Sequence, residues 1–291
     1  MMRRVLCLTG LLAAASARQE TAVFRSNVDL VALPCTVVDA RGAPVSGLAR
    51  EDFRVTDNGV RRVVEHLWID EQPLTVGVLI DASPSQEEQL AEHRETARRV
   101  LESLLRPGDH TFRIEVSATL RLFADGAGLP QPFGELCPTG ICGASPLWNA
   151  VYDAARLPLR TLAGAEGAAR ALLILTDGFD TGSTHTWREA ADEAHKADAA
   201  VYAVHYTSGF GGTFAPDLAR LIAETGGASF GAPKGDYSAI VSRLETDLRR
   251  RYVLGFRPEK LSGKVRHEVD VEVTRPELTV RARKVYIQPA R

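Results

Sequence analysis

The sequence has few cysteines, no strong excess of either charge and no long hydrophobic run beyond its first residues. Its 35 basic and 37 acidic residues leave a net charge of −2, so no overall field favours nucleic acid or an anionic membrane. It lacks paired Cys-x-x-Cys motifs and His-Glu-x-x-His, which argues against zinc. The motifs of serine hydrolases, phosphate-binding loops and dinucleotide-binding folds are also missing. We therefore expect a globular protein that is not an enzyme.

The one apolar run stands at the start of the chain. A basic beginning, Met1 to Arg4, precedes the run from Val5 to Ala15, which is followed by Ser16-Ala17. This layout is typical of a secretory signal peptide, so we expect residues 1–17 to be removed and the protein to be exported to the periplasm or out of the cell. The run is too short for a stable membrane anchor. An uncleaved interfacial segment is the alternative.

The four cysteines are compatible with export. Cys7 would leave with the signal peptide, and Cys137 and Cys142 bracket a turn-rich loop that a disulfide could close in an oxidising compartment. Cys35 lies in an apolar, strand-like run, and we predict a buried free thiol there.

Two segments at the ends of the mature chain have the alternating pattern of half-exposed strands. Residues 18–72 contain short alternating runs and a strong hairpin turn at Asp57-Asn58-Gly59. Residues 251–291 alternate again, as in Val269, Val271 and Val273, which are separated by charges. Strands of a parallel sheet covered on both faces are apolar on both sides, so they do not show this alternation. We therefore predict that the two segments pair into a β-sandwich-like unit.

Residues 73–250 alternate instead between fully apolar strands and amphipathic helices. The predicted strands are Leu74–Ile80, Phe112–Val116, Leu120–Phe123, Ala171–Leu175, Val201–Tyr206 and Ala228–Phe230, and the predicted helices are Gln86–Arg106, Pro146–Leu157, Thr186–Ala197, Ala215–Glu224 and Tyr237–Arg250. This alternation predicts an α/β domain with a doubly wound, mainly parallel sheet.

Oxygen-bearing side chains follow the strands of this domain where ligands bind in open α/β sheets, beyond the carboxyl ends. Asp81, Ser83 and Ser85 come directly after the first buried strand, in the order Asp-x-Ser-x-Ser. Ser145 stands at the start of a predicted helix, and Asp177 follows the apolar strand that ends at Leu175, within Thr-Asp-Gly. Five hard oxygen ligands without nitrogen or sulfur favour Mg²⁺ or Mn²⁺.

These three segments resemble the metal-ion-dependent adhesion site of von Willebrand factor type A (VWFA) domains. The stretches LVALPCTVVDARGAPVSGLAREDFRVTDNGV, LLILTDGFDTGS and RRRYVLGFRP also resemble the secreted bacterial VWFA-related family, over nearly all of the mature chain. The resemblance implies a divalent cation held by Asp81, Ser83, Ser85, Ser145 and Asp177. In that family the serine hydroxyls bind the metal directly, the carboxylates often act through water, and a partner protein supplies an Asp or Glu carboxylate. The sequence departs from the family at Ser145, where Thr is usual, and at Gln86, where an apolar residue is common.

Each element of the site also has an ordinary structural interpretation. Ser85 with Glu88 fits a capping box, Ser145 before Pro146 fits a helix N-cap, and Asp177-Gly178 fits a strand-ending turn. A structural or assembly module with a silent metal site is therefore one alternative function. A metal-dependent hydrolase is another, although Ser83 stands where its second acid would be needed.

Several nearby residues receive simpler predictions. We expect Asp180 and Thr181 to belong to a solvated loop, His195 to be solvent-exposed, and Trp68 and Trp148 to serve packing.

Overall fold

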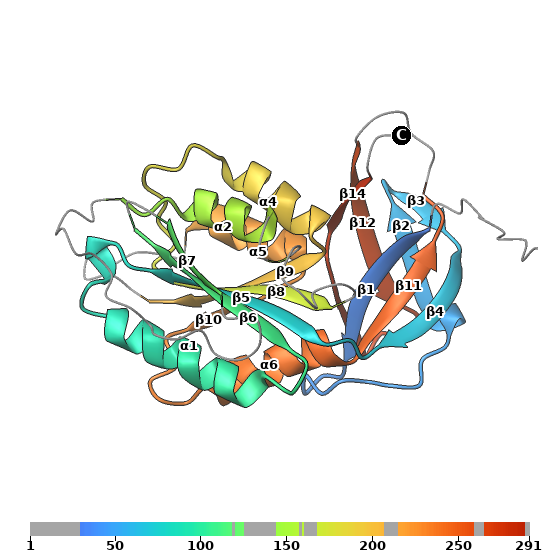
Figure 1. Cartoon of the computed structure of the whole chain (residues 1–291). Helices are drawn as coiled ribbons and strands as arrows, with labels where there is room; N and C mark the ends of the chain where they lie inside the picture. The colour runs from blue at the N-terminus through green and yellow to red at the C-terminus, as the bar shows by residue number, and fades with distance from the viewer. Residues whose placement is uncertain are drawn as a thin grey trace, which may run out of the picture.

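A computed structural model describes residues 30–117, 120–124, 144–156, 159, 168–206, 215–258 and 265–288. In these residues an α/β domain and a β-sandwich lie side by side (Figure 1). The expected signal peptide and the loop between Cys137 and Cys142 lie outside the described residues. None of the described helices is long and apolar enough to span a membrane.

The α/β domain is built on a six-stranded sheet in the order β10-β9-β8-β5-β6-β7. Five strands are parallel and β7 is antiparallel to β6. The strands are β5 (Leu74–Asp81), β6 (His110–Val116), β7 (Leu120–Ala124), β8 (Ala169–Thr176), β9 (Ala199–His205) and β10 (Ser229–Gly231). Every residue of the central strand β5 is buried, as a sheet covered on both faces requires. The predicted doubly wound, mainly parallel sheet is confirmed.

Helices cover both faces of this sheet (Figure 1). On one face α1 (Leu90–Leu104) and α6 (Ser238–Arg249) pack their apolar sides against β5 and β8. On the other face lie α2 (Leu147–Arg156), α4 (Trp187–Lys196) and α5 (Pro216–Thr225). Trp148 is buried in that second layer, so the prediction that it serves packing is confirmed.

Local capping sets the ends of two of these helices. At the start of α4, Thr186 accepts a hydrogen bond from the amide of Glu189, and the Glu189 carboxylate accepts one from the Thr186 amide in return. Helix α5 starts with Pro216 and ends at Gly226, whose φ of +79° is the left-handed conformation that favours glycine. Their sequence signals are local, which is why both helices were predictable.

The sandwich joins the two ends of the described chain, as predicted. One antiparallel sheet has the order β13-β1-β11-β4 and the other β14-β12-β2-β3. The strands are β1 (Val31–Val38), β2 (Phe53–Asp57), β3 (Val60–Arg62), β4 (Val64–Asp70), β11 (Arg251–Phe256), β12 (Val265–Val273), β13 (Thr279–Ala282) and β14 (Val285–Gln288). A 3-10 turn, η1 (Arg50–Asp52), precedes β2. The inward faces of both sheets form one apolar core around Leu33, Leu254 and Phe256.

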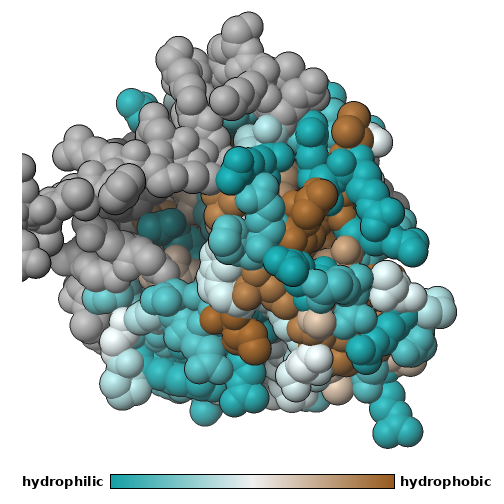
Figure 2. All heavy atoms as spheres, turned by 90° about the vertical axis from the view of Figure 1, so that its right-hand side faces the viewer, coloured by the Kyte–Doolittle hydropathy of each residue, from teal (hydrophilic) through white to brown (hydrophobic). Residues whose placement is uncertain are grey.

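Cys35 lies in this core as a buried free thiol, which confirms the prediction, and burial raises its pKa to about 12. Trp68 is 41% exposed on β4, so it packs with only part of its surface. It lies with Val60, Val63 and Ile69 among the exposed apolar residues at the open edges β3 and β4. Figure 2 faces this end of the molecule and shows separate apolar areas among polar side chains, which is ordinary for a protein surface.

Candidate metal centre

The candidate site lies at the middle of the central sheet. Strand β5 lies between β6 and β8, and the chain continues from β6 and from β8 toward opposite edges. At this reversal the carboxyl ends of β5 and β8 are adjacent, with Ile80 paired to Leu175. Asp81 is the last residue of β5, and Asp177 comes directly after β8. The two predicted carboxylates therefore end neighbouring strands at the usual ligand-binding position of an open α/β sheet.

Asp81 is fully buried and held by two hydrogen bonds. Its Oδ1 accepts from the backbone N–H of Ser83 (3.0 Å), and its Oδ2 accepts from the Thr176 hydroxyl (2.7 Å). Burial raises the pKa of Asp81 above its ordinary value, against the lowering effect of these bonds, and nearby Asp177 raises it further. A second buried carboxylate beside the first favours a positive charge between or beside them.

The two serines of Asp-x-Ser-x-Ser connect Asp81 to Asp177. The hydroxyl oxygens of Ser83 and Ser85 are 3.1 Å apart, and the Ser85 hydroxyl donates to Asp177 Oδ2 at 3.0 Å. Both serines lie at the short 3-10 turn η2 (Pro84–Gln86), of which Ser83 is the N-cap. Four of the five predicted site residues thus form one hydrogen-bonded cluster.

The capping-box interpretation of Ser85 and Glu88 is wrong. Helix α1 begins at Leu90, with Gln89 at its N-cap, and η2 ends at Gln86, the first residue of the predicted helix. Ser85 therefore lies outside the helix, and its hydroxyl is bound to Asp177.

Asp177 forms the predicted turn and also belongs to the cluster. Its Oδ1 accepts from the Phe179 backbone N–H (3.1 Å), and Gly178 between them has a φ of +86°. Its Oδ2 accepts from Ser85 and also from Nε2 of Gln86 (2.9 Å). The turn holds the carboxylate in place without using its second oxygen.

Ser145 is buried close to the loop that follows Asp177. Its backbone N–H donates to the Thr181 hydroxyl, and its carbonyl accepts from the Thr181 N–H, both at 2.8 Å. The Ser145 hydroxyl is buried and has no hydrogen-bond partner among the described residues. Ser145 is not hydrogen-bonded to the other four predicted residues, so the structure joins four of the five and leaves the fifth with an unused oxygen.

The N-cap interpretation of Ser145 is also wrong, because other residues cap α2. The Asp180 carboxylate accepts from the Trp148 N–H at 3.1 Å, and the Ser183 hydroxyl accepts from the Asn149 N–H at 3.2 Å. Asp180, placed by the sequence in a solvated loop, is thus a helix cap contributed from 32 residues downstream.

The sequence analysis did not identify His93, a buried polar residue next to the candidate site. His93 is fully buried on the apolar side of α1, where its Nδ1 lies 3.2 Å from the Asp81 carbonyl oxygen and its ring packs on Tyr206. Burial lowers the pKa of His93 to about 4. The available signal was a polar residue in line with the apolar residues Ala97 and Val100.

The donor set fits a small, hard divalent cation. No group of three or more His, Cys, Asp and Glu residues that could hold a metal occurs in the described ranges. The candidate set instead has two carboxylates and three hydroxyls, which matches the oxygen preference of Mg²⁺ and Mn²⁺ and leaves room for water ligands. The buried, unpaired hydroxyl of Ser145 is an oxygen that such a cation could satisfy.

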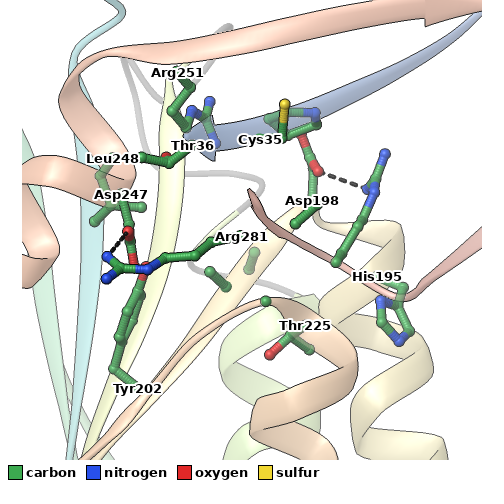
Figure 3. Close-up of a pocket in the computed structure, with 16 residues that line it drawn as sticks. Cys35, Thr36, His195, Asp198, Tyr202, Thr225, Asp247, Leu248, Arg251 and Arg281 are labelled. Atoms are coloured by element: carbon green, nitrogen blue, oxygen red, sulfur yellow. Dashed lines mark hydrogen bonds and ion pairs between the residues drawn. The ribbon is translucent and has the colours of Figure 1, made fainter. Parts of the chain in front are cut away.

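A small cavity lies between the α/β domain and the sandwich, at the end of the sheet opposite the candidate metal centre (Figure 3). Its volume is about 40 Å³, which suits water and little more. Arg281 pairs with Asp247 and Arg283 with Asp198 across it, so its charges are used to join the two parts of the molecule. His195 also lines it and is buried, so the prediction that this histidine is exposed is wrong. We assign this cavity a structural role.

Comparisons with known proteins concern the fold. No protein-family model matches the chain, and no curated protein matches it. Solved structures that match include the conserved hypothetical protein BatB from Bacteroides thetaiotaomicron, with 16% identity, a TM-score of 0.41 and coverage of 59% of this chain and 97% of that one. The VWA domain of SpRpn10 matches with 11% identity, a TM-score of 0.43 and coverage of 58% and 94%. Proximal thread matrix protein 1 from the mussel byssus matches with 12% identity, a TM-score of 0.48 and coverage of 64% and 49%. All three matches have TM-scores below 0.5. The doubly wound, mainly parallel sheet of the α/β domain is established by its own strand order.

Proposed function

We propose that this chain is an exported protein-binding module that depends on a divalent cation. The cation, Mg²⁺ or Mn²⁺, is held by Asp81, Ser83, Ser85, Ser145 and Asp177, and it takes an Asp or Glu carboxylate from a partner protein. The proposal is for a binding function without catalysis.

One observation carries this proposal: two buried carboxylates, Asp81 and Asp177, end neighbouring parallel strands and are linked through the backbone N–H and hydroxyls of the Asp-x-Ser-x-Ser loop. The buried carboxylates supply negative charge, while the hydroxyls are neutral ligands. A cation bound mainly through hydroxyls stays electron-poor, so it would attract a further carboxylate from outside.

The loop position gives such a partner access. Ser85 is exposed, whereas Asp81 and Asp177 are 0% and 3% exposed. Phe179, two residues after Asp177, is 48% exposed at the same edge and is held there by its N–H bond to Asp177. The arrangement places the carboxylates beneath and a serine hydroxyl at the surface, where a partner can approach.

The proposal is tested by calorimetric titration of the purified, metal-stripped protein with Mg²⁺ and with Mn²⁺. We expect saturable one-to-one binding, and we expect the double variant Ser83→Ala, Ser85→Ala to abolish it. Ser229→Ala, which removes an exposed hydroxyl from β10, is the matched control and should bind as the unmodified protein does. Absence of binding at millimolar cation would refute the metal centre.

The alternative function, an assembly module with a silent metal site, is favoured by one contact. Asp177 Oδ2 already accepts from both Ser85 and Gln86, so the carboxylate is satisfied without a cation. The same titration separates the two functions, because a silent site binds neither ion. Export is tested separately by N-terminal sequencing of protein recovered outside the cytoplasm, which should begin at Arg18.

A further inference from the structure

The residue after the Asp-x-Ser-x-Ser segment, Gln86, has a buried amide at the candidate site. Gln86 ends η2 and is 0% exposed. Its Nε2 donates to Asp177 Oδ2 at 2.9 Å and to the Ser85 carbonyl oxygen at 3.2 Å. Burying a polar amide is unfavourable unless it makes hydrogen bonds, so these two contacts position the Nε2 end of the amide, while its buried Oε1 has no partner among the described residues.

The Gln86 bond completes the hydrogen bonding of one carboxylate oxygen. Asp177 Oδ2 receives one donor from Ser85 and one from Gln86, and Oδ1 receives the Phe179 N–H. Each carboxylate oxygen has about two lone-pair positions, so Oδ2 is fully used. Asp81 Oδ1 accepts from the Ser83 N–H and Oδ2 accepts from the Thr176 hydroxyl, and the Ser83 side chain also hydrogen-bonds to this carboxylate. Gln86 is thus the donor that fills the last lone-pair position of Asp177 Oδ2.

We infer that Gln86 is a positioning residue that occupies Asp177 Oδ2 and thereby lowers the affinity of the site for its cation. This inference rests on the proposed function, because it concerns the same cation site. While the Gln86 amide is in place, Asp177 acts through the Ser85 hydroxyl and does not ligate the ion with Oδ2. A cation at the site would then have fewer carboxylate oxygens among its ligands, so more of its positive charge would stay available to a partner carboxylate.

The test compares Gln86→Met with the unmodified protein. Methionine has nearly the same length and removes both polar atoms, so it frees Oδ2 while filling the same space. Gln89→Met is the matched control: Gln89 is the N-cap of α1, its side-chain oxygen also has no partner among the described residues, and it makes no hydrogen bond to Asp177. Mn²⁺ affinity is measured from the free-ion electron paramagnetic resonance signal, and the water bound to the ion from proton relaxation.

We expect Gln86→Met to bind Mn²⁺ about tenfold more tightly, because a carboxylate oxygen joins the ligands. The ion should also carry fewer bound waters than in the unmodified protein, and Gln89→Met should change neither quantity. A merely structural role for Gln86 would lower stability without changing the number of waters on the ion.

The outcomes separate this inference from the proposed function. If the unmodified protein binds Mn²⁺ and Gln86→Met binds it equally or more weakly, the inference is overturned and the proposed function stands. If only Gln86→Met binds, the inference holds and the site of the natural chain is silent. If neither protein binds, both ideas fail.

A second variant covers the case in which Gln86→Met does not fold. Gln86→Glu keeps the shape of the side chain but replaces the donor with a like charge facing Asp177. We expect its melting temperature to fall in chelator and to rise with Mn²⁺ by more than that of the unmodified protein. Equal Mn²⁺-dependent rises in the two proteins would contradict the inference.

Discussion

At the start of helix α2, Asp180 acts as a helix cap and Ser145 is proposed to be a cation ligand. Two single substitutions test these different roles. Asp180 accepts a hydrogen bond from the Trp148 N–H in the first turn of α2, whereas the buried Ser145 hydroxyl makes none among the described residues. Asp180→Ala should therefore destabilise the metal-free protein, and Ser145→Ala should not.

The size of the effect follows from the contacts. Loss of a side-chain cap costs about 1 kcal/mol, and loss of a negative charge at a helix N-terminus about 0.3–1 kcal/mol more. Asp180 also accepts from the Ser183 hydroxyl, which loses this acceptor but keeps the bond from the Asn149 N–H. We expect a total of about 1–2 kcal/mol for Asp180→Ala, or roughly 2–8 °C in melting temperature for a domain of this size. Removing the unpaired Ser145 hydroxyl should leave metal-free stability unchanged or slightly raised.

The assay is urea unfolding with chelator and again with excess Mg²⁺. In Mg²⁺ the order of the three stabilities should change. The unmodified protein and Asp180→Ala gain stability from the bound ion, whereas Ser145→Ala gains much less because it lacks one ligand. A loss of stability in chelator as large for Ser145→Ala as for Asp180→Ala would show that Ser145 caps the helix, and it would refute the reasoning.

Two further predictions concern packing and pH. A Cβ at Gly77 would lie 2.2 Å from Phe112 Cζ, so we expect Gly77→Ala to destabilise the protein by about 1–3 kcal/mol in urea unfolding. Adding Phe112→Leu should recover part of that loss, and no recovery would contradict the steric cause. Burial lowers the pKa of His195 below its ordinary value of 6.5, so the unfolded chain takes up a proton before the folded one does. The free energy of unfolding should therefore decline as the pH falls below 6.5 and level off below the pKa of His195 in the folded protein. His195→Asn should flatten that decline when the free energy of unfolding is measured over acid pH. The exposed control His66→Asn should not flatten it.

Much of the fold was predictable because its signals are local. The continuous apolar runs of β5 and β8 indicate strands covered on both faces, and the alternation of β12 indicates strands covered on one face. Asn58 and Gly59 have φ of +50° and +76°, as the predicted hairpin turn requires. Each of these features depends on neighbouring residues along the chain, so a single sequence contains it.

The positions of the candidate residues in the fold were predictable, whereas their hydrogen-bond partners were less so. The order Asp-x-Ser-x-Ser placed Asp81, Ser83 and Ser85 after a buried strand, where the structure has them. The link to Asp177 joins residues 92 positions apart, and it depends on β5 and β8 being neighbours in the sheet. The cation itself stays a prediction.

The sequence by itself determined which segments become strands and helices and which oxygen-bearing residues end them, because hydrophobic periodicity and turn chemistry act over a few residues. Only the tertiary structure decided which hydrogen bonds those residues make and which of them are buried. Asp180, not Ser145, caps α2; Gln86 completes the hydrogen bonding of Asp177; and His195 is enclosed between the α/β domain and the sandwich. These outcomes arise because buried donors and acceptors must be satisfied by whatever side chains the packing brings near, however distant in the chain.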